Sequence, residues 1–198
     1  MDDQREDPDR ESDGSVDDML RHLDEAKGLE DAGEARRSRT GSGLRDKIRR
    51  RTDVAILASN HEARLKETVT SDAVTHRSGK RWSSAKAGVE AHGRLPIYYR
   101  LDGEVTHKAY ITRLELDPDE DTPGVEEFVR NIPEADTYSD YNERLDTTTF
   151  LVRDGERLDE PFSQSELRKL DGGEPIDEDY SYQPAYVRQR PGDFPDFP

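Results

Sequence analysis

The sequence contains no cysteine, only one tryptophan and no long apolar run. The absence of cysteine excludes disulfides, thiolate metal sites and cysteine nucleophiles. No apolar run approaches the roughly 20 residues of a membrane-spanning helix. The start of the chain, MDDQREDPDR, is unlike a signal peptide. We therefore expect a cytoplasmic protein that has no membrane partner.

Apolar residues are scarce, because 30% of the 198 residues are hydrophobic and 38% are charged. This composition predicts a small core and some disorder. The 46 acidic residues outnumber the 30 basic ones, which gives a net charge of -16, and only seven of the basic residues are lysines. Such acidic, lysine-poor surfaces suit a very salty cytoplasm, and the composition resembles that of salt-loving archaea.

The charge is unevenly distributed along the chain. Residues 1–34 hold 14 acidic and 4 basic groups, residues 35–100 hold 6 acidic and 16 basic groups, and residues 101–198 hold 26 acidic and 10 basic groups. Only the middle segment is net positive. A positive segment in an acidic protein favours a polyanionic partner.

The N-terminal part of the chain reads as an arm and a linker. Residues 1–14 form an acidic arm that we expect to be disordered. Residues 15–52 form a helical and basic linker segment, with a helix capped by Ser15 that reaches to about Ala32. That helix either docks on a partner or packs on its own domain. The basic helix at 44–51 either follows phosphates, with Arg49 and Arg50 as contacts, or pairs with the acidic arm.

The folded domain is expected at residues 53–190 and is followed by a Pro-rich tail at 191–198. The pattern predicts a buried strand at 54–59, a helix capped by Asn60 with Ala63, Leu65 and Val69 as its apolar residues, and a helix at 84–91 that ends at Gly93. Two strands follow around the Asp102-Gly103 turn. Further on we expect a short helix at 125–131, a strand at 147–152 that ends in a turn at Asp154-Gly155, a helix at 163–170 and a last strand.

No catalytic motif stands out in the sequence. HExxH and GxSxG are absent, and Ser78-Gly79-Lys80 lacks both the upstream glycine of a phosphate loop and the Ser or Thr that follows its lysine. The acidic stretch at 117–124 lacks the glycine and the final glutamate of a calcium loop, so we interpret it as a solvated turn. We expect a non-catalytic protein without a cofactor or a bound metal.

The stretch from Arg77 to Leu116 contains the only tryptophan, Trp82, in a basic loop that precedes a hairpin. Trp82 is either an anchor in the core or loop, or a platform on which a base stacks. Of the adjacent residues Tyr98 and Tyr99 in the following strand, one is expected to face inward and the other outward. At most one of these two tyrosines therefore lines a site.

The order of elements from residue 54 onward resembles the PUA-like superfamily. It is most similar to the YTH and EVE domains, which bind a modified base of RNA or DNA in an aromatic pocket on a small β-barrel. Ser59-Asn60 after the first strand and Trp82-Ser83 after the first helix match positions of the YTH pattern. The resemblance implies an α+β fold, a small mixed β-barrel with flanking short helices.

The same resemblance implies roles for individual residues. Asn60 would hydrogen-bond the edge of a base, Trp82 would stack on its face, and Tyr138 or Tyr141 would replace the further aromatic cage residues of those families. Flipped bases are read in this way, by polar contacts at one edge and by stacking. Arg77, Lys80 and Arg81 would contact phosphates.

Two hypotheses follow for function. The first is a nucleic-acid-binding module that recognises a base, modified or not, in RNA or DNA without catalysis. The second is a regulatory protein that docks a protein partner through residues 15–27 and 36–51. The sequence leaves both open.

Overall fold

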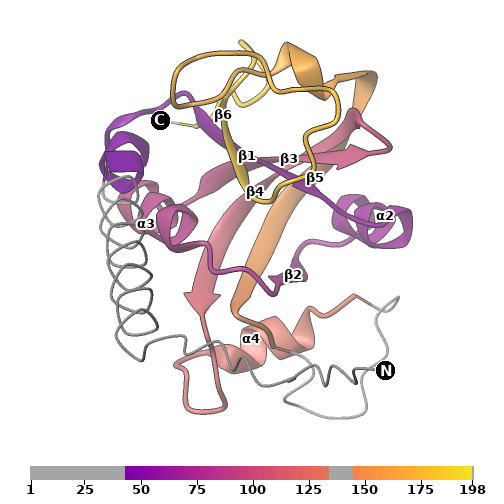
Figure 1. Cartoon of the computed structure of the whole chain (residues 1–198). Helices are drawn as coiled ribbons and strands as arrows, with labels where there is room; N and C mark the ends of the chain where they lie inside the picture. The colour runs from indigo at the N-terminus through magenta and orange to yellow at the C-terminus, as the bar shows by residue number, and fades with distance from the viewer. Residues whose placement is uncertain (1–42, 134–144, 198) are drawn as a thin grey trace, which may run out of the picture. The chain divides into compact units, whose positions relative to one another are not determined.

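The computed structural model describes residues 43–133 and 145–197 of the chain. One six-stranded sheet with flanking short helices forms an α+β fold, so the α+β part of the expected fold class is confirmed (Figure 1). The strands are β1 (Val54–Ser59), β2 (Val74–Ser78), β3 (Leu95–Leu101), β4 (Glu104–Leu116), β5 (Thr148–Ser163) and β6 (Ala185–Arg188). The helices are α2 (Glu62–Thr70), α3 (Ser83–His92), α4 (Val125–Arg130), the 3-10 turn η2 (Gln164–Glu166) and a helical segment at 43–50. The arm at 1–14 and the helix expected from Ser15 lie outside the described residues.

The strands lie in the order β2-β5-β4-β3-β1-β6. β1 and β3 are parallel, and all other neighbours are antiparallel. β2 and β6 are edge strands that do not pair with each other, so within the described residues the sheet does not close into a barrel. The strand β2 was not anticipated, because VTHRS reads as the start of the basic loop.

The sheet is strongly curved. Two strands separate β2 from β3, which puts them roughly 14 Å apart in a flat sheet. Nevertheless, the His76 ring on β2 and the Tyr99 hydroxyl on β3 are in direct contact, with Nδ1 and Oη 2.6 Å apart. Register shifts along the β4–β5 pair accompany this bend. The curvature brings one edge of the sheet toward its middle and encloses a hollow.

Several local predictions are confirmed. The apolar run VAILAS forms β1, and its first five residues are buried. The turn between β3 and β4 has positive φ at Asp102 (52°) and Gly103 (86°), as a type I′ hairpin requires. Helix α3 ends at Gly93, which has a φ of 76°. Each of these elements is specified by residues that are neighbours in the sequence.

Both Tyr98 and Tyr99 are buried, so the expectation that one of them would face outward was wrong. Their side chains alternate as in any strand, but both faces of β3 are covered. The Tyr98 hydroxyl donates to Asp193 Oδ2 at 2.6 Å, and its ring meets Phe194 with centroids 5.0 Å apart. The tail at 191–197 therefore completes the core, which reaches beyond the expected limits of 53–190.

The helical segment at 43–50 also packs on this core, through Ile48, which has no exposed surface. The His92 ring of α3 donates from Nε2 to the Ile48 carbonyl at 2.9 Å. A Cβ added at Gly88 of α3 would lie 2.7 Å from Ile48 Cγ2. A glycine at this position thus allows the two helices to approach closely.

Helix α2 differs from its prediction at its start and on its buried face. Its N-cap is His61, without a side-chain cap bond, while the Asn60 side chain accepts from the His61 N–H at 2.9 Å. Leu65 is buried as expected, but Ala63 and Val69 are exposed. The buried face of α2 instead includes Thr68, a polar residue that the apolar pattern cannot reveal.

The turn expected at Asp154-Gly155 is a bulge inside β5, which continues to Ser163. Asp154 has a φ of 53°. A Cβ at Gly155 would lie 2.1 Å from the Thr68 carbonyl oxygen. Gly155 therefore lets the C-terminal end of α2 approach β5. The local sequence alone predicts a hairpin turn at this point.

The helix expected at 163–170 was also wrong, since only Gln164–Glu166 form a single 3-10 turn. Residues 167–170 instead bond to distant segments. Leu170 N donates to the Tyr186 carbonyl at 2.8 Å, and Ile176 N donates to the Leu167 carbonyl at 2.9 Å. These backbone bonds join residues that are more than one helical turn apart. The helical spacing of apolar residues at 163–170 therefore did not produce a helix.

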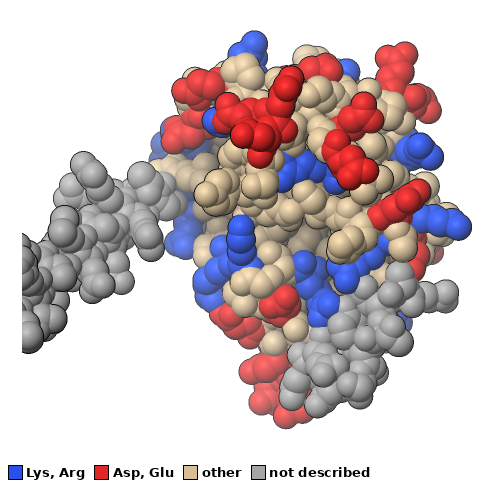
Figure 2. Space-filling model, turned by 45° about the vertical axis from the view of Figure 1, so that its right-hand side comes forward, with Lys and Arg blue, Asp and Glu red and all other residues tan. Residues whose placement is uncertain are grey.

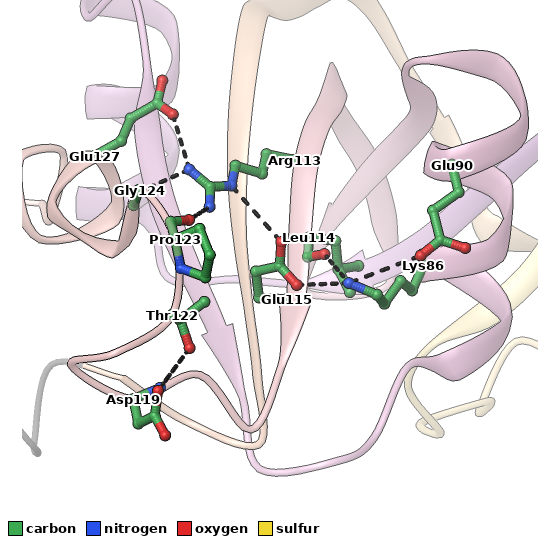
Figure 3. A network of polar contacts seen from close by, with 10 residues as sticks. All are labelled: Lys86, Glu90, Arg113, Leu114, Glu115, Asp119, Thr122, Pro123, Gly124 and Glu127. Atoms are coloured by element: carbon green, nitrogen blue, oxygen red, sulfur yellow. Dashed lines mark hydrogen bonds and ion pairs between the residues drawn. The ribbon is translucent and has the colours of Figure 1, made fainter.

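The acidic loop at 117–124 is tied to the sheet by Arg113 of β4. The guanidinium donates to the carbonyls of Pro123 and Gly124 and to the Glu127 carboxylate of α4. Lys86 of α3 joins this arrangement by donating to Glu115 at 2.5 Å, and Glu115 in turn faces Arg113 (Figure 3). We refer to Lys86, Glu90, Arg113, Glu115 and Glu127 as the Arg113 network.

Candidate functional site

Four residues that the sequence singled out meet in one hollow. Ser59, Asn60, Arg77 and Trp82 line a pocket of about 230 Å³, which we call the Asn60 pocket. The other lining residues are Ala58, His61, Arg64, His76, Tyr99, Phe150 and Gln183. The pocket thus combines the end of β1, the start of α2, the end of β2 and the residue before α3. The curvature of the sheet is what brings them together.

Aromatic rings form one side of the pocket. The rings of Trp82 and Phe150 are stacked, with centroids 4.8 Å apart and an interplanar angle of 29°. His76 meets Phe150 and Tyr99 edge to face, at 5.7 Å and 5.2 Å. Trp82 is 2% exposed, and its backbone N–H donates to Thr148 Oγ1 at 3.0 Å. Trp82 is therefore a core anchor that also lines the pocket, and stacking on a ligand stays a prediction.

The indole nitrogen of Trp82 is unusual. Nε1 is buried and has no hydrogen-bond partner within residues 43–133 and 145–197. An unsatisfied buried donor costs about 1–3 kcal/mol, so most are paired in folded proteins. An N–H without a partner on a pocket-lining side chain is a donor that a ligand can use.

His76 is completely buried and neutral. Burial, with a contribution from the nearby Arg64 charge, lowers the pKa of His76 to about 3. Burial likewise raises the pKa of Tyr99, so the phenol keeps its proton. Tyr99 therefore donates to His76 Nδ1 across 2.6 Å.

The other ring nitrogen of His76 is also engaged. The Thr68 hydroxyl donates to the Arg64 carbonyl at 2.8 Å, so its oxygen accepts from His76 Nε2, 3.2 Å away. These roles assign the proton of the neutral ring to Nε2. With a donor role at Nε2 and an acceptor role at Nδ1, His76 is a structural member of the pocket wall.

Asn60 presents its amide N–H groups at the pocket. Its Oδ1 accepts from the His61 N–H, which fixes which end of the amide is which. Its Nδ2 lies 3.3 Å from both ring nitrogens of His76. Because both ring nitrogens of His76 already have other hydrogen-bond partners, the Asn60 amide does not need to donate to either of them.

The Ser59 hydroxyl is oriented by a buried arginine. Arg100, which is 6% exposed, donates from Nε to Ser59 Oγ at 2.7 Å. The same guanidinium donates to Gln164 Oε1 and to the Tyr180 carbonyl. Burial lowers the pKa of Arg100, with the Tyr180 phenol acting in the opposite direction. Since Ser59 Oγ accepts from Arg100, its own proton is left to donate.

The charge around the pocket differs from that of the whole chain. The pocket lining described above contains two arginines, Arg64 and Arg77, and no carboxylate, although the chain has 46 acidic residues. Figure 2 shows the α2 side of the molecule, where blue side chains border a tan, hollowed area near the centre and red side chains lie mainly above and below it. The local environment therefore favours electron-rich or anionic groups.

The other predicted site residues lie elsewhere or outside the described part. Ser83 is the first residue of α3, and it is not among the lining residues. The Lys80 ammonium lies 5.7 Å from the Tyr182 ring centroid, and Arg81 forms an ion pair with Asp117. Arg49 and Arg50 are exposed on the helical segment at 43–50. Tyr138 and Tyr141 lie outside the described residues.

Sequence reasoning missed His76, Phe150 and Arg64 as members of the pocket. His76 and Phe150 face each other across the β2–β5 pair, in register. No short motif contains them, and β2 itself was read as a loop. If β2 had been recognised as a strand, the alternation of its side chains would have assigned His76 to one face, but its partner β5 begins 74 residues after β2 does.

A second hollow, of about 610 Å³, lies along the other flank of α2. Its walls include Val69, which is 41% exposed, together with Leu101 and His107. Burial, and then the Arg157 charge, lowers the pKa of His107. No predicted base-binding or phosphate-binding residue is among the described walls of this hollow.

Comparisons with protein-family models, with curated proteins and with solved structures gave no match to this chain. The fold and the pocket alone therefore define its class, an α+β protein with a curved mixed sheet and a small aromatic hollow. Within the described part of the chain, no group of three or more His, Cys, Asp or Glu residues could hold a metal ion. None of the helices described combines the length and the apolar character of a membrane span.

Proposed function

We propose that the Asn60 pocket receives a single base of a nucleic-acid strand, and that the protein binds RNA or DNA without modifying it. The observation that carries this proposal is the composition of the pocket. Aromatic rings of Trp82, Phe150 and Tyr99 lie beside the Asn60 amide, and no carboxylate is present in the described lining. Proteins read a flipped base with this combination, a ring contact on its face and hydrogen bonds at its edge.

The size of the pocket supports one small ring as the ligand. Its volume is about 230 Å³. Cavities of roughly 150 Å³ accommodate benzene, and drug-sized ligands occupy roughly 300–1,000 Å³. The pocket is therefore suited to a single planar ring, and the rest of a longer ligand would lie outside it.

The surrounding charges support a phosphate-bearing ligand. Arg64 and Arg77 line the pocket, and the exposed residues Lys80 and Arg81 lie in the loop that follows β2. In very high salt such charges contribute little, because counterion release loses its advantage. The affinity would then rest on the pocket itself, and the arginines would matter most at low salt.

We also propose that the curved sheet is an incomplete barrel of the PUA-like type. Two observations support this proposal. Ser59-Asn60 and Trp82, which carry the resemblance in the sequence, line the same hollow. The sheet bends until β2 meets β3 side chains, as the wall of a small barrel does.

The geometry at His76 favours binding over catalysis. Both ring nitrogens have hydrogen-bond partners, and the depressed pKa keeps the ring neutral near pH 7. A general acid or base requires a pKa near the working pH and contact with the reacting group. His76 meets neither condition.

The proposal can be tested with fluorescently labelled single-stranded RNA and DNA of mixed sequence and the full chain, by anisotropy titration at low and high salt. Asn60→Ala should weaken binding about tenfold, the value of one or two lost hydrogen bonds at a buried edge. Asn131→Ala, at the end of α4 and not among the described lining residues, is the matched control. Trp82→Phe is preferable to Trp82→Ala, because it keeps a ring in the core.

Two results would contradict the proposal. One is that neither RNA nor DNA binds to the wild-type protein at any salt concentration. The other is that Asn60→Ala and Asn131→Ala bind as tightly as wild type.

The alternative, a regulatory protein that docks a partner through residues 15–27 and 36–51, stays a prediction. Residues 1–42 lie outside the described part of the chain. In the described remainder, Ile48 packs into the core while Arg49 and Arg50 are exposed. Deleting residues 1–52 and finding every cellular association intact would remove this alternative.

A further inference from the structure

We infer that Tyr182 stacks on the base next to the one in the Asn60 pocket, so that the protein binds two consecutive nucleotides of a strand. This inference rests on the proposed function and extends its site beyond the pocket. Its basis is an exposed aromatic ring beside the mouth of a pocket that has room for one base.

Tyr182 leaves a large aromatic surface in contact with water. Its side chain is 71% exposed, and Val69 is the other large apolar side chain that is exposed in residues 43–133 and 145–197. A single exposed apolar side chain is ordinary on a protein surface. The position of the Tyr182 ring and the way its segment is held therefore carry the argument.

The Tyr182 ring lies beside the mouth of the pocket. Gln183, the next residue in the sequence, lines the pocket, whereas Tyr182 is not among the described lining residues. The Lys80 ammonium lies 5.7 Å from the centroid of the Tyr182 ring, and Lys80 precedes the lining residue Trp82 by two positions. The ring is therefore placed between two segments that both contribute to the pocket wall. The next nucleotide of a strand whose base fills the pocket would emerge there.

The segment that carries the ring is anchored by two buried polar side chains. Gln164 donates from Nε2 to the Asp177 carbonyl at 2.8 Å, and Arg100 donates to the Tyr180 carbonyl. Both of these donors are buried. The same Arg100 guanidinium holds Ser59 in the pocket wall, at 2.7 Å. The pocket wall and the backbone next to the exposed ring therefore share one anchor.

The facing segment, which contains Lys80, is held by Thr148. The Thr148 hydroxyl donates to the Lys80 carbonyl at 2.8 Å and accepts from the Trp82 N–H at 3.0 Å. The Lys80 side chain is exposed, and its cation is attracted to the face of the Tyr182 ring. The backbone on both sides of the mouth is thus fixed before a ligand arrives. A tyrosine ring, with two side-chain torsions, loses little conformational entropy when it stacks.

Stacking outside the pocket suits both the ligand and the composition of the chain. The pocket volume of about 230 Å³ leaves no place for a second base. Every base has a flat π-face, so stacking on tyrosine accepts any neighbouring base. Stacking involves no charge and keeps its strength in high salt, where contacts between cations and phosphates are screened. An acidic chain suited to a salty medium can therefore rely on it.

The test uses labelled strands of about ten nucleotides that carry the same phosphates. One strand is abasic throughout, one carries a single base in an abasic backbone, and one carries two adjacent bases. Each is made in a pyrimidine and an adenine version, in whichever of DNA or RNA binds the full chain more tightly, and is titrated by anisotropy. The second base should increase affinity about tenfold, which equals about 1.4 kcal/mol and lies within the range for base–aromatic stacking.

Variants then assign this gain to the ring. Tyr182→Ala should remove the gain from the second base and should leave the single-base strand within about twofold of wild type. Tyr182→Phe should keep the gain, and so should Val69→Ala, the matched control at the other exposed apolar side chain. The loss in Tyr182→Ala should be the same at low and high salt, whereas Lys80→Ala should lose affinity only at low salt. Because these three side chains are exposed, their substitution should leave the fold intact.

The outcomes separate this inference from the proposed function. A twofold gain follows from statistics alone, since either base can enter the pocket, so a gain no larger than this in wild type would overturn the inference. A gain that persists in Tyr182→Ala, or a loss that disappears at high salt, would overturn it as well. Equal weakening of the single-base and two-base strands would place the ring against the base in the pocket and not against its neighbour. If the single-base strand binds no more tightly than the abasic strand, the pocket takes no base, and the proposed function fails together with the inference.

Discussion

The Arg113 network and the Asn60 pocket use the same kinds of side chain in opposite ways. In the network, Arg113 meets Glu115, Glu127 and two backbone carbonyls, and Lys86 meets Glu115 and Glu90 (Figure 3). In the pocket, arginines line a hollow whose described walls hold no carboxylate. Donors in the first region are satisfied by neighbouring acceptors, while the Trp82 indole in the second has no acceptor among the described residues.

This difference separates a structural use of charge from a functional one. Arg113 holds the acidic loop at 117–124 against β4 and α4, and the donors of the network face acceptors of the protein itself. In an acidic chain, carboxylates are available almost everywhere to pair with a cation. Their absence from the lining that residues 43–133 and 145–197 provide is therefore the informative feature, more than the presence of arginine.

The largest effect should come from removing the aromatic wall of the pocket. Trp82→Ala should lower the free energy of unfolding by about 3–5 kcal/mol, because a buried ring stacked on Phe150 leaves a cavity. Trp82→Phe should cost clearly less. Urea denaturation measures both, with Tyr182→Ala, at a 71% exposed residue, as a control expected within about 0.5 kcal/mol of wild type. A loss of less than 1 kcal/mol in Trp82→Ala would contradict the core role.

The next effect concerns the network. Arg113→Met keeps an unbranched side chain but removes the guanidinium, which lies over the Phe128 ring and bonds to Pro123, Gly124 and Glu127. Hydrogen bonds of a charged group are worth about 1.5–3 kcal/mol when the partners stay buried, and less when water replaces them. We expect a loss of about 1–3 kcal/mol in urea denaturation, with the exposed Arg130→Met as control. Ligand binding should not change, and a binding defect would erase the distinction between the two regions.

A pH-dependent effect follows from the neutral histidine in the pocket wall. The pKa of His76 is about 3 in the folded protein, below its usual 6.5. Between these values the unfolded chain binds the proton and the folded protein does not. The contribution of His76 to stability is therefore present above pH 6.5 and is lost as the pH falls toward 3, by up to about 1.4 kcal/mol per pH unit.

The measurement compares the stability of wild type and of His76→Gln from pH 4 to pH 7. The wild type should show the steeper decline toward low pH. The lowered pKa of His107 adds a slope to both proteins and cancels in the difference. Identical slopes would mean that His76 is solvated in solution and that the pocket is more open than the structure shows.

Parts of the fold that depend on neighbouring residues could be predicted from the sequence. The run VAILAS predicted β1, Asp102-Gly103 predicted the hairpin, and Gly93 predicted the end of α3. These predictions are correct because an apolar run or a turn with positive φ depends on neighbouring residues alone. Ser59-Asn60 and Trp82 were singled out, and they do share a pocket. The order of elements was sufficient to suggest that they would meet.

The remaining features depend on contacts between distant residues. Asp154-Gly155 has the sequence of a hairpin turn, but it forms a bulge because β5 pairs onward with β4 and because α2 packs against Gly155. Residues 163–170 have helical spacing, yet Leu170 bonds to Tyr186. His76 became part of the pocket only through the curvature of the sheet. A single sequence does not reveal which of these distant residues are in contact.

The smallest effect distinguishes the two regions by their response to salt. Arg77 lines the pocket, where a phosphate of a bound strand would lie close to it, while Arg113 carries the same charge inside the network. Each phosphate contact on a single strand contributes about 0.7 to the slope of log affinity against log salt. Arg77→Ala should therefore reduce the slope by roughly that amount, and its affinity should converge with that of wild type at high salt. Arg113→Met should leave the slope unchanged, because Arg113 is not among the residues that line the pocket. An equal change of slope in both variants would mean that only the net charge of the protein matters, and a change in neither would place the phosphates away from Arg77.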